Sequence, residues 1–159
     1  MAVEVLILRQ GDARYEEMFG QLRADRALLA DLWAAAESRL DEHPGKTWIV
    51  AVEAGVPVAW CAYEPTDEQG AEVKCVDSYE RREAWGRGLY ARVFWARHRL
   101  IRRAEAITYV FAQPLGLHLS AGWRITGEGD RSEPGIPSHH WYELRRSPGD
   151  VGTYRRPRA

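Results

Sequence analysis

The chain has 159 residues, of which 45% are hydrophobic and 28% are charged, a balance that is typical of one globular domain and excludes a disordered chain. Its formal net charge of −1 provides no overall positive field that would attract nucleic acid. No run approaches the roughly 20 apolar residues of a membrane span, and the first residues lack the pattern of a signal peptide, so we expect a soluble, cytoplasmic protein.

The first third of the chain predicts one strand and two helices. Alternation of side chains predicts a strand over residues 3–9. Two helical stretches follow, and in the second one apolar residues recur at helical spacing and form a single stripe: Leu29, Leu32, Trp33, Ala36 and Leu40. The loop 41–46 contains a proline and a glycine, which end that helix.

The middle of the chain predicts a hairpin, a third strand and a helix. Residues 48–52 and 56–63 flank a short turn, and residues 71–79 follow as the third strand after a polar loop. A glycine-rich turn then opens a helix whose apolar residues face one way: Leu89, Val93, Ala96 and Leu100.

The last third predicts a short strand over residues 106–111, a short helix over residues 115–121, and two final strands over residues 123–127 and 139–145. The predicted order is therefore strand, two helices, three strands, helix, strand, helix, two strands. This order predicts an α/β domain in which helices cover both faces of a mixed sheet.

Four residues are expected in the core rather than in a site. Cys61 and Cys75 are too few for a disulfide framework and lack the spacing of a zinc site, so we expect small buried residues in a reducing cytoplasm. Trp48 and Trp60 lie on the predicted hairpin, and we expect them to be buried because aromatic side chains dominate core packing.

The turn between the third strand and its helix has the chemistry of a phosphate site. Gly86 and Gly88 allow the backbone to approach a ligand closely, and the helix start adds backbone N–H groups and partial positive charge. Arg87 adds a full charge. The turn lacks the lysine and serine of a P-loop, and Ala91 stands where the dinucleotide fingerprint continues. The alternative is an ordinary turn at the start of a helix.

Residues 85–90 (WGRGLY) resemble the pyrophosphate loop of the GNAT superfamily of N-acetyltransferases, Arg/Gln-x-x-Gly-x-Gly/Ala, with Trp85 and Tyr90 as the two departures. Residues 117–123 (LHLSAGW) look like the family's Leu-Tyr-x-x-x-Gly-Phe segment. Further stretches resemble a bacterial, ElaA-like branch of the superfamily, at residues 112–113, 127–128 and 133–140.

The resemblance covers residues 3–146 and implies the GNAT fold, a mixed, mostly antiparallel twisted sheet of about seven strands with helices on both faces. It implies one acyltransferase domain over residues 1–146 and a flexible basic tail over residues 147–159. The implied co-substrate is acetyl-CoA or a related acyl-CoA, without a metal, and the acceptor is an amine of a small molecule or peptide. A homodimer is left open, and no membrane or nucleic-acid partner is expected.

The resemblance also implies the site residues. The cofactor is expected to contact the end of the third strand, the turn, the helix start and one later glutamine: Glu80, Arg81, Gly86, Arg87, Gly88, Leu89, Tyr90, Ala91 and Gln113. The acceptor is expected to contact the variable regions 14–42 and 127–140.

The implied catalytic residues are His118, Glu133 and His140. His118 stands where the family has a tyrosine that protonates the departing thiolate, and a histidine can perform this step. Tyr90 and Tyr142 are the alternative acids. The general base is left open among Glu133, His140 and three further groups: Asp77, Glu80 and His139. Strand alternation places residues 139 and 140 on opposite sides, so one of them at most points into a cleft.

Two alternatives to an amine acetyltransferase follow from the same residues. Trp85, Tyr90 and His118 depart from the family pattern, which favours a protein that binds CoA without acyl transfer. A toxin-like acetyltransferase acting on aminoacyl-tRNA is the other alternative, and the net charge of −1 argues against it.

Overall fold

The computed structural model describes residues 2–36, 39–133 and 136–150. The chain divides into two units: unit 1 is Met1–Pro65 with Cys75–Leu100, and unit 2 is Thr66–Lys74 with Ile101–Ala159. The helices and strands follow in the predicted order: β1 (Val3–Leu8), α1 (Tyr15–Ala24), α2 (Arg26–Ala36), β2 (Thr47–Glu53), β3 (Val56–Pro65), β4 (Glu72–Glu80), the short 3₁₀ helix η1 (Arg82–Ala84), α3 (Leu89–Ile101), β5 (Glu105–Val110), α4 (Ala112–Ser120), β6 (Arg124–Glu133) and β7 (Ile136–Arg146).

In the described part of the chain the strands form a seven-stranded sheet in the order β1-β2-β3-β4-β5-β7-β6. β1, β2 and β3 pair antiparallel, as do β5, β7 and β6, whereas β4 and β5 pair in parallel over three residue pairs. The prediction of a mixed, mostly antiparallel sheet of about seven strands is confirmed.

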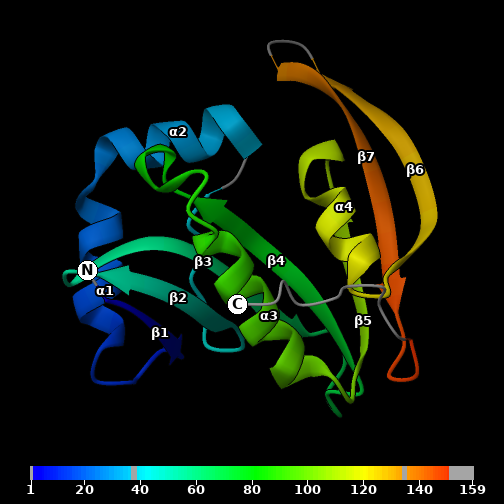
Figure 1. The fold of residues 1–159 in the computed structure, drawn as a ribbon, viewed down its shortest axis with the longest axis horizontal. Helices are drawn as coiled ribbons and strands as arrows, with labels where there is room; N and C mark the ends of the chain where they lie inside the picture. Colours follow the sequence, from blue (N-terminus) through cyan, green and yellow to red (C-terminus); the bar gives the residue numbers. More distant parts are fainter. Residues whose placement is uncertain (1, 37–38, 134–135, 151–159) are drawn as a thin grey trace. The chain divides into compact units, whose positions relative to one another are not determined.

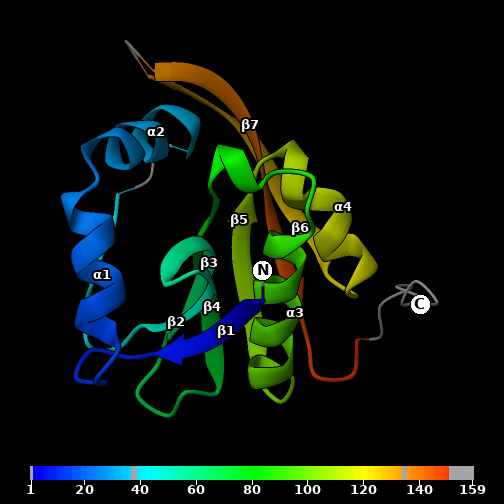
Figure 2. The same cartoon turned by 60° about the vertical axis from the view of Figure 1, so that its left-hand side comes forward.

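Strand β2 shows how unit 1 is layered, because it is buried from Thr47 to Val52. Trp48, Val50 and Val52 pack in one cluster with α1 and α2, whereas Ile49 and Ala51 pack in another with α3. Figure 2 shows α1 and α2 on one side of β1–β3 and α3 on the other. Helices therefore cover both faces of the sheet in unit 1, as predicted.

The predicted core residues of the hairpin are confirmed. Trp48 is 0% exposed and Trp60 is 1% exposed, and both lie in the cluster on the α1 and α2 side. Cys61 and Cys75 are buried and form no disulfide with each other.

The predicted apolar stripe on α2 is confirmed in part. Leu32 is buried in the core cluster, and Leu29 and Leu40 are partly buried and pack against it, although Leu40 lies beyond the end of the helix at Ala36. Trp33 departs from the prediction, because it is 46% exposed. Leu28 and Leu32 lie one helical turn apart and pack in the core cluster, so they define the buried face of α2 and leave Trp33 outside it.

The stripe on α3 is likewise only partly as predicted. Leu89, Val93 and Ala96 are buried, but Leu100 is 42% exposed and the next residue, Ile101, is buried in its place.

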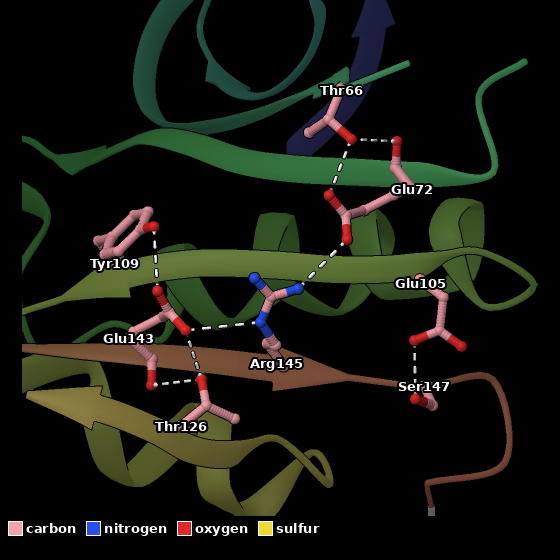
Figure 3. A network of polar contacts seen from close by, with 8 residues as sticks. All are labelled: Thr66, Glu72, Glu105, Tyr109, Thr126, Glu143, Arg145 and Ser147. Atoms are coloured by element: carbon pink, nitrogen blue, oxygen red, sulfur yellow. Dashed lines mark hydrogen bonds and ion pairs between the residues drawn. The ribbon is translucent and has the colours of Figure 1, made fainter. Parts of the chain in front are cut away.

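Unit 2 contains β5, β7 and β6 with α4 along one face (Figure 1). β6 and β7 are longer than predicted and form a hairpin that spans Arg124–Glu133 and Ile136–Arg146. A polar network crosses these strands (Figure 3): Arg145 contacts Glu72 (3.3 Å) and Glu143 (3.5 Å), and Glu143 accepts hydrogen bonds from Thr126 (2.8 Å) and Tyr109 (3.1 Å). The network ties four strands of unit 2 together.

The predicted flexible tail begins with an ordered turn. The carboxylate of Asp150 accepts a hydrogen bond from the backbone N–H of Ser147 (2.8 Å), and its carbonyl oxygen lies 3.4 Å from Arg146. Residues 151–159 lie outside the described residues. None of the described helices has both the length and the apolar character that a membrane crossing requires.

Candidate functional site

The glycine turn lies in unit 1 between β4 and α3, as predicted. Gly86 and Gly88 have φ values of 76° and 72°, a left-handed conformation that side chains disfavour. A Cβ atom placed on either glycine would meet nothing within 4 Å, so the space beside this backbone is open. Leu89 then begins α3 and is buried, which anchors the helix start in the core.

Glu80 and Trp85 border the turn. The Glu80 carboxylate accepts a hydrogen bond from the backbone N–H of Tyr90 (3.1 Å), and the Trp85 indole N–H donates to the Glu80 carbonyl oxygen (3.1 Å). Trp85 itself is 53% exposed. A carboxylate therefore already occupies a backbone donor at the start of α3.

Three arginines in the turn or just before it have carboxylate partners in unit 1. Arg81 donates to Asp25 (2.9 Å) and to the carbonyl oxygen of Pro57 (2.8 Å), and its side chain is only 12% exposed. The other two pairs are Arg82 with Asp31 and Arg87 with Glu53. Arg81 is thus committed to a half-buried structural contact, whereas the Arg87 pair lies at the surface.

Tyr90 points away from the turn. Its ring packs against the cluster beneath α3, its hydroxyl is buried, and burial raises its pKa. The charge of the buried Arg97 guanidinium acts on Tyr90 and opposes this rise in pKa. Tyr90 therefore adds no bulk to the phosphate turn, and its buried hydroxyl is poorly placed to protonate a thiolate.

Asp77 and Lys46 form a buried ion pair on the α1 and α2 side of unit 1. Lys46 is 2% exposed and also donates to the carbonyl oxygen of Asp41 (2.7 Å). Asp77 has a φ of 55°, an uncommon conformation for a residue inside a strand. Burial raises the pKa of Asp77, and Lys46 opposes that rise. Sequence reasoning named Asp77 as a candidate base but treated Lys46 only as part of a loop.

In unit 2, Gln113 is exposed in the first turn of α4, and His118 is buried near its end. The Nδ1 atom of His118 lies 2.9 Å from the carbonyl oxygen of Pro114, so this nitrogen carries a proton and donates it. The His118 ring meets Trp123 edge to face, 5.4 Å between centroids. The hydrogen bond to Pro114 keeps the proton of the neutral imidazole on Nδ1. Nε2 is therefore the nitrogen of His118 that can take up or release a proton.

His140 lies on the β6–β7 hairpin between two carboxylates. Its Nδ1 is 2.7 Å from Asp130, and its Nε2 is 2.9 Å from Glu128. The hydrogen bond to Asp130, and then the one to Glu128, raises the pKa of His140. A raised pKa favours the charged imidazolium, which cannot accept a proton, so this arrangement disfavours His140 as a base. Glu133 ends β6, and the side chains of Glu133 and His139 lie outside the described residues.

A groove of about 620 Å³ lies in unit 1 within the region where we expect acceptor contacts, and it is lined by Arg23, Leu29, Trp33, Arg39, Leu40 and Glu42. The Arg39 guanidinium lies 5.2 Å from the centroid of the Trp33 ring. Glu42 contacts Arg23 (3.0 Å) and accepts a hydrogen bond from the Tyr15 hydroxyl (3.0 Å). Across residues 2–36, 39–133 and 136–150, no three His, Cys, Asp or Glu side chains gather in a way that could hold a metal ion.

No protein-family model matches the chain, and no curated protein matches it by sequence. Solved structures do match. ElaA from Escherichia coli is 13% identical with a TM-score of 0.67, and the match covers 92% of this chain and 100% of ElaA. An acyl-CoA N-acyltransferase from Pseudomonas aeruginosa is 16% identical with a TM-score of 0.64, and the match covers 92% of this chain and 100% of that protein. A GNAT family acetyltransferase from Elizabethkingia anophelis, solved with acetyl-CoA bound, is 12% identical with a TM-score of 0.56. That match covers 91% of this chain and 97% of the acetyltransferase. The chain therefore has the GNAT fold that residues 85–90 and 117–123 predict.

Proposed function

We propose that this protein is an acyl-CoA-dependent N-acyltransferase that moves an acetyl group from acetyl-CoA to a primary amine of a small molecule or peptide. The observation that carries the proposal is the turn at Gly86 and Gly88. It joins β4 to α3 with two left-handed glycines and open space beside each, in a fold that also occurs in an acetyltransferase with acetyl-CoA bound.

The residues of the turn fit the pyrophosphate of CoA. Backbone N–H groups at the start of α3 and the surface guanidinium of Arg87 supply donors and positive charge for phosphate oxygens. We propose that residues 86–91 hold the pyrophosphate and that the pantetheine arm runs along β4, adding to it by backbone hydrogen bonds. Backbone N–H groups of the same strand would polarise the thioester carbonyl.

The reaction is a direct attack. The amine nitrogen forms a bond to the acetyl carbon, the C–S bond breaks, and the proton of the amine leaves to a base while the CoA thiolate gains one from an acid. His118 is the candidate acid through its Nε2 nitrogen, with Tyr142 as the alternative. Asp77 is a candidate base, because burial raises the pKa of its carboxyl group.

The groove beside Trp33 is the candidate acceptor site. Its lining combines the apolar side chains of Leu29 and Leu40 with charged side chains of both signs. Such a lining suits an amine that bears an apolar or aromatic group, because the aromatic face of Trp33 attracts both rings and cations.

Thermal protection by CoA tests the proposal at the level of binding. A ligand that binds only the folded protein stabilises it by about 2.7 kcal/mol at a hundredfold excess over its dissociation constant. We expect saturating CoA and acetyl-CoA to raise the melting temperature, and an unchanged melting temperature with both would contradict the proposal.

The second candidate function is a CoA-binding protein without transferase activity. The observation that favours it is the Nδ1 hydrogen bond of His118, because a neutral His118 in this tautomer presents an acceptor, rather than a proton donor, at Nε2. CoA binding without release of free thiol in the presence of any amine would select this candidate.

A further inference from the structure

The carboxylate of Glu80 occupies the position at the start of α3 where the proposed function places a phosphate. Its Oε1 atom accepts a hydrogen bond from the backbone N–H of Tyr90, 3.1 Å away. Tyr90 is the second residue of α3, and the first N–H groups of a helix have no partner inside the helix. The helix dipole stabilises a carboxylate there for the same reason that it stabilises a phosphate.

Glu80 is held in this position by its neighbours. Its backbone carbonyl oxygen accepts the indole N–H of Trp85 (3.1 Å). The Arg82 guanidinium lies 5.5 Å from the Trp85 ring centroid and donates to the Asp31 carboxylate (2.9 Å). Trp85 is thus a link between the end of β4 and the turn, which gives a structural role to this departure from the family pattern.

The guanidinium of the turn, Arg87, is already paired with another carboxylate. Arg87 lies within electrostatic reach of Glu80, but its guanidinium binds both oxygens of Glu53. A pyrophosphate at residues 86–91 would bring negative charge next to the Glu80 carboxylate, and like charges at short range repel each other.

We propose that Glu80 competes with the pyrophosphate of CoA for the start of α3, so that CoA binds only when the Glu80 carboxylate leaves the N–H of Tyr90. This inference rests on the proposed function. It requires two opposite effects of removing the carboxylate: the ligand-free protein becomes less stable because α3 loses a capping hydrogen bond, and CoA binds more tightly because nothing has to be displaced. A carboxylate that only caps the helix gives the first effect without the second.

Calorimetric titration of CoA into the full chain and three variants tests the competition. Glu80→Ala removes the hydrogen bond and the charge, and Glu80→Gln removes the charge but keeps an acceptor of the same shape. Glu83→Gln is the matched control, because Glu83 lies on η1, is exposed and comes no closer than 4.0 Å to Arg81. We expect the Kd for CoA to fall about tenfold in Glu80→Ala and by a smaller factor in Glu80→Gln. Glu83→Gln is expected to stay within about twofold of the wild type.

Pantetheine, which lacks the pyrophosphate, serves as the second probe and is expected to bind all four proteins alike. Melting temperatures of the ligand-free proteins show that each variant is folded, with Glu80→Ala the least stable. If the wild type binds CoA and both Glu80 variants bind it equally or less tightly, the competition is refuted and the proposed function stands. An equal gain in Glu83→Gln would attribute the effect to net charge and also refute it. If the wild-type protein binds no CoA, both the competition and the proposed function are refuted.

Discussion

The Nδ1 atom of His118 lies 2.9 Å from the carbonyl oxygen of Pro114, and the Nδ1 atom of His98 lies 2.8 Å from the carbonyl oxygen of Phe94, one helical turn earlier in each case. Both histidines are buried, at 1% and 6% exposure. The two residues therefore share one geometry on different helices, and only His118 is proposed as a general acid.

This pair gives a controlled test of His118. We expect His118→Ala to lower kcat by roughly 10²–10⁴-fold, the range for loss of a general acid, with little change in CoA affinity. His118→Tyr should keep part of the rate, because the resemblance of residues 117–123 to the GNAT segment implies a tyrosine acid at this position. His98→Ala is the control for the loss of a buried imidazole and should leave kcat within about threefold. Comparable losses in the His118 and His98 variants would mean that packing, not acid catalysis, explains the effect.

Gly88→Val tests the turn. With φ at 72° a β-branched side chain strains the backbone, and it fills the open space that the pyrophosphate requires. We expect CoA affinity to fall by at least about a hundredfold in a protein that remains folded. Gly11→Val is the control, because Gly11 has a φ of 96° and equally open surroundings but lies in the loop before α1. Normal CoA affinity in a folded Gly88→Val variant would show that the turn only begins α3 and does not bind the pyrophosphate.

Arg81 and Arg87 should respond differently to the same substitution. Arg81→Gln breaks a contact with Asp25 and Pro57 that is largely shielded from solvent, and should cost about 1–3 kcal/mol of stability while CoA affinity changes by less than about threefold. Arg87→Gln breaks a surface pair with Glu53, which costs about 0–1 kcal/mol of stability. It should weaken CoA binding by about tenfold, because the Arg87 guanidinium lies at the surface, where a phosphate can compete with Glu53 for it. Chemical denaturation and calorimetry measure the two effects separately, and the reverse assignment would contradict this reading.

The Lys46–Asp77 pair predicts a stability change that depends on pH. Lys46→Met leaves a buried carboxylate without its counter-charge, which should cost about 3–5 kcal/mol near pH 7. Burial already holds the pKa of Asp77 above its ordinary value, and Lys46 opposes that rise. A group with a raised folded-state pKa contributes stability at acid pH that is lost as the pH rises through that pKa. The deficit of Lys46→Met should therefore shrink as the pH is lowered and Asp77 is protonated.

Urea denaturation of Lys46→Met at a series of pH values measures this deficit. The double variant Lys46→Met/Asp77→Asn is the control, since asparagine tolerates the φ of 55° and carries no charge. It should recover much of the loss near pH 7 and show a smaller dependence on pH. A deficit that stays constant from neutral to acid pH would show that the cost comes from lost packing of the lysine chain.

The order of helices and strands could be predicted because each is coded by local patterns. Alternation marks β1, two apolar runs around a short turn mark β2 and β3, and the glycines at 86 and 88 mark the start of α3. The faces of helices were less predictable. Trp33 and Leu100 belong to helical stripes in the sequence but are exposed. Core packing of Leu28 and Leu32 in α2, and burial of Ile101 in place of Leu100 in α3, decide which face of each helix is buried.

The site was predictable only as far as its local motif. The glycine turn carries its own signal, but the partners that decide its charge come from distant parts of the sequence. Arg87 binds Glu53 across 34 positions, Arg81 binds Asp25 across 56, and Lys46 binds Asp77 across 31. Such pairs depend on strand register and helix packing, which no single-sequence pattern specifies.

Release of free thiol from acetyl-CoA in the presence of amines tests the proposed acyl transfer most directly. The wild-type protein is assayed with amino acids, polyamines, aminoglycosides and peptides, alongside Gly88→Val and a reaction without amine. We predict that at least one class of amine accelerates thiol release above the amine-free rate, that the amine gains an acetyl group, and that Gly88→Val loses this acceleration. Tight binding of CoA by the wild-type protein with no amine-dependent thiol release from any class would contradict the account.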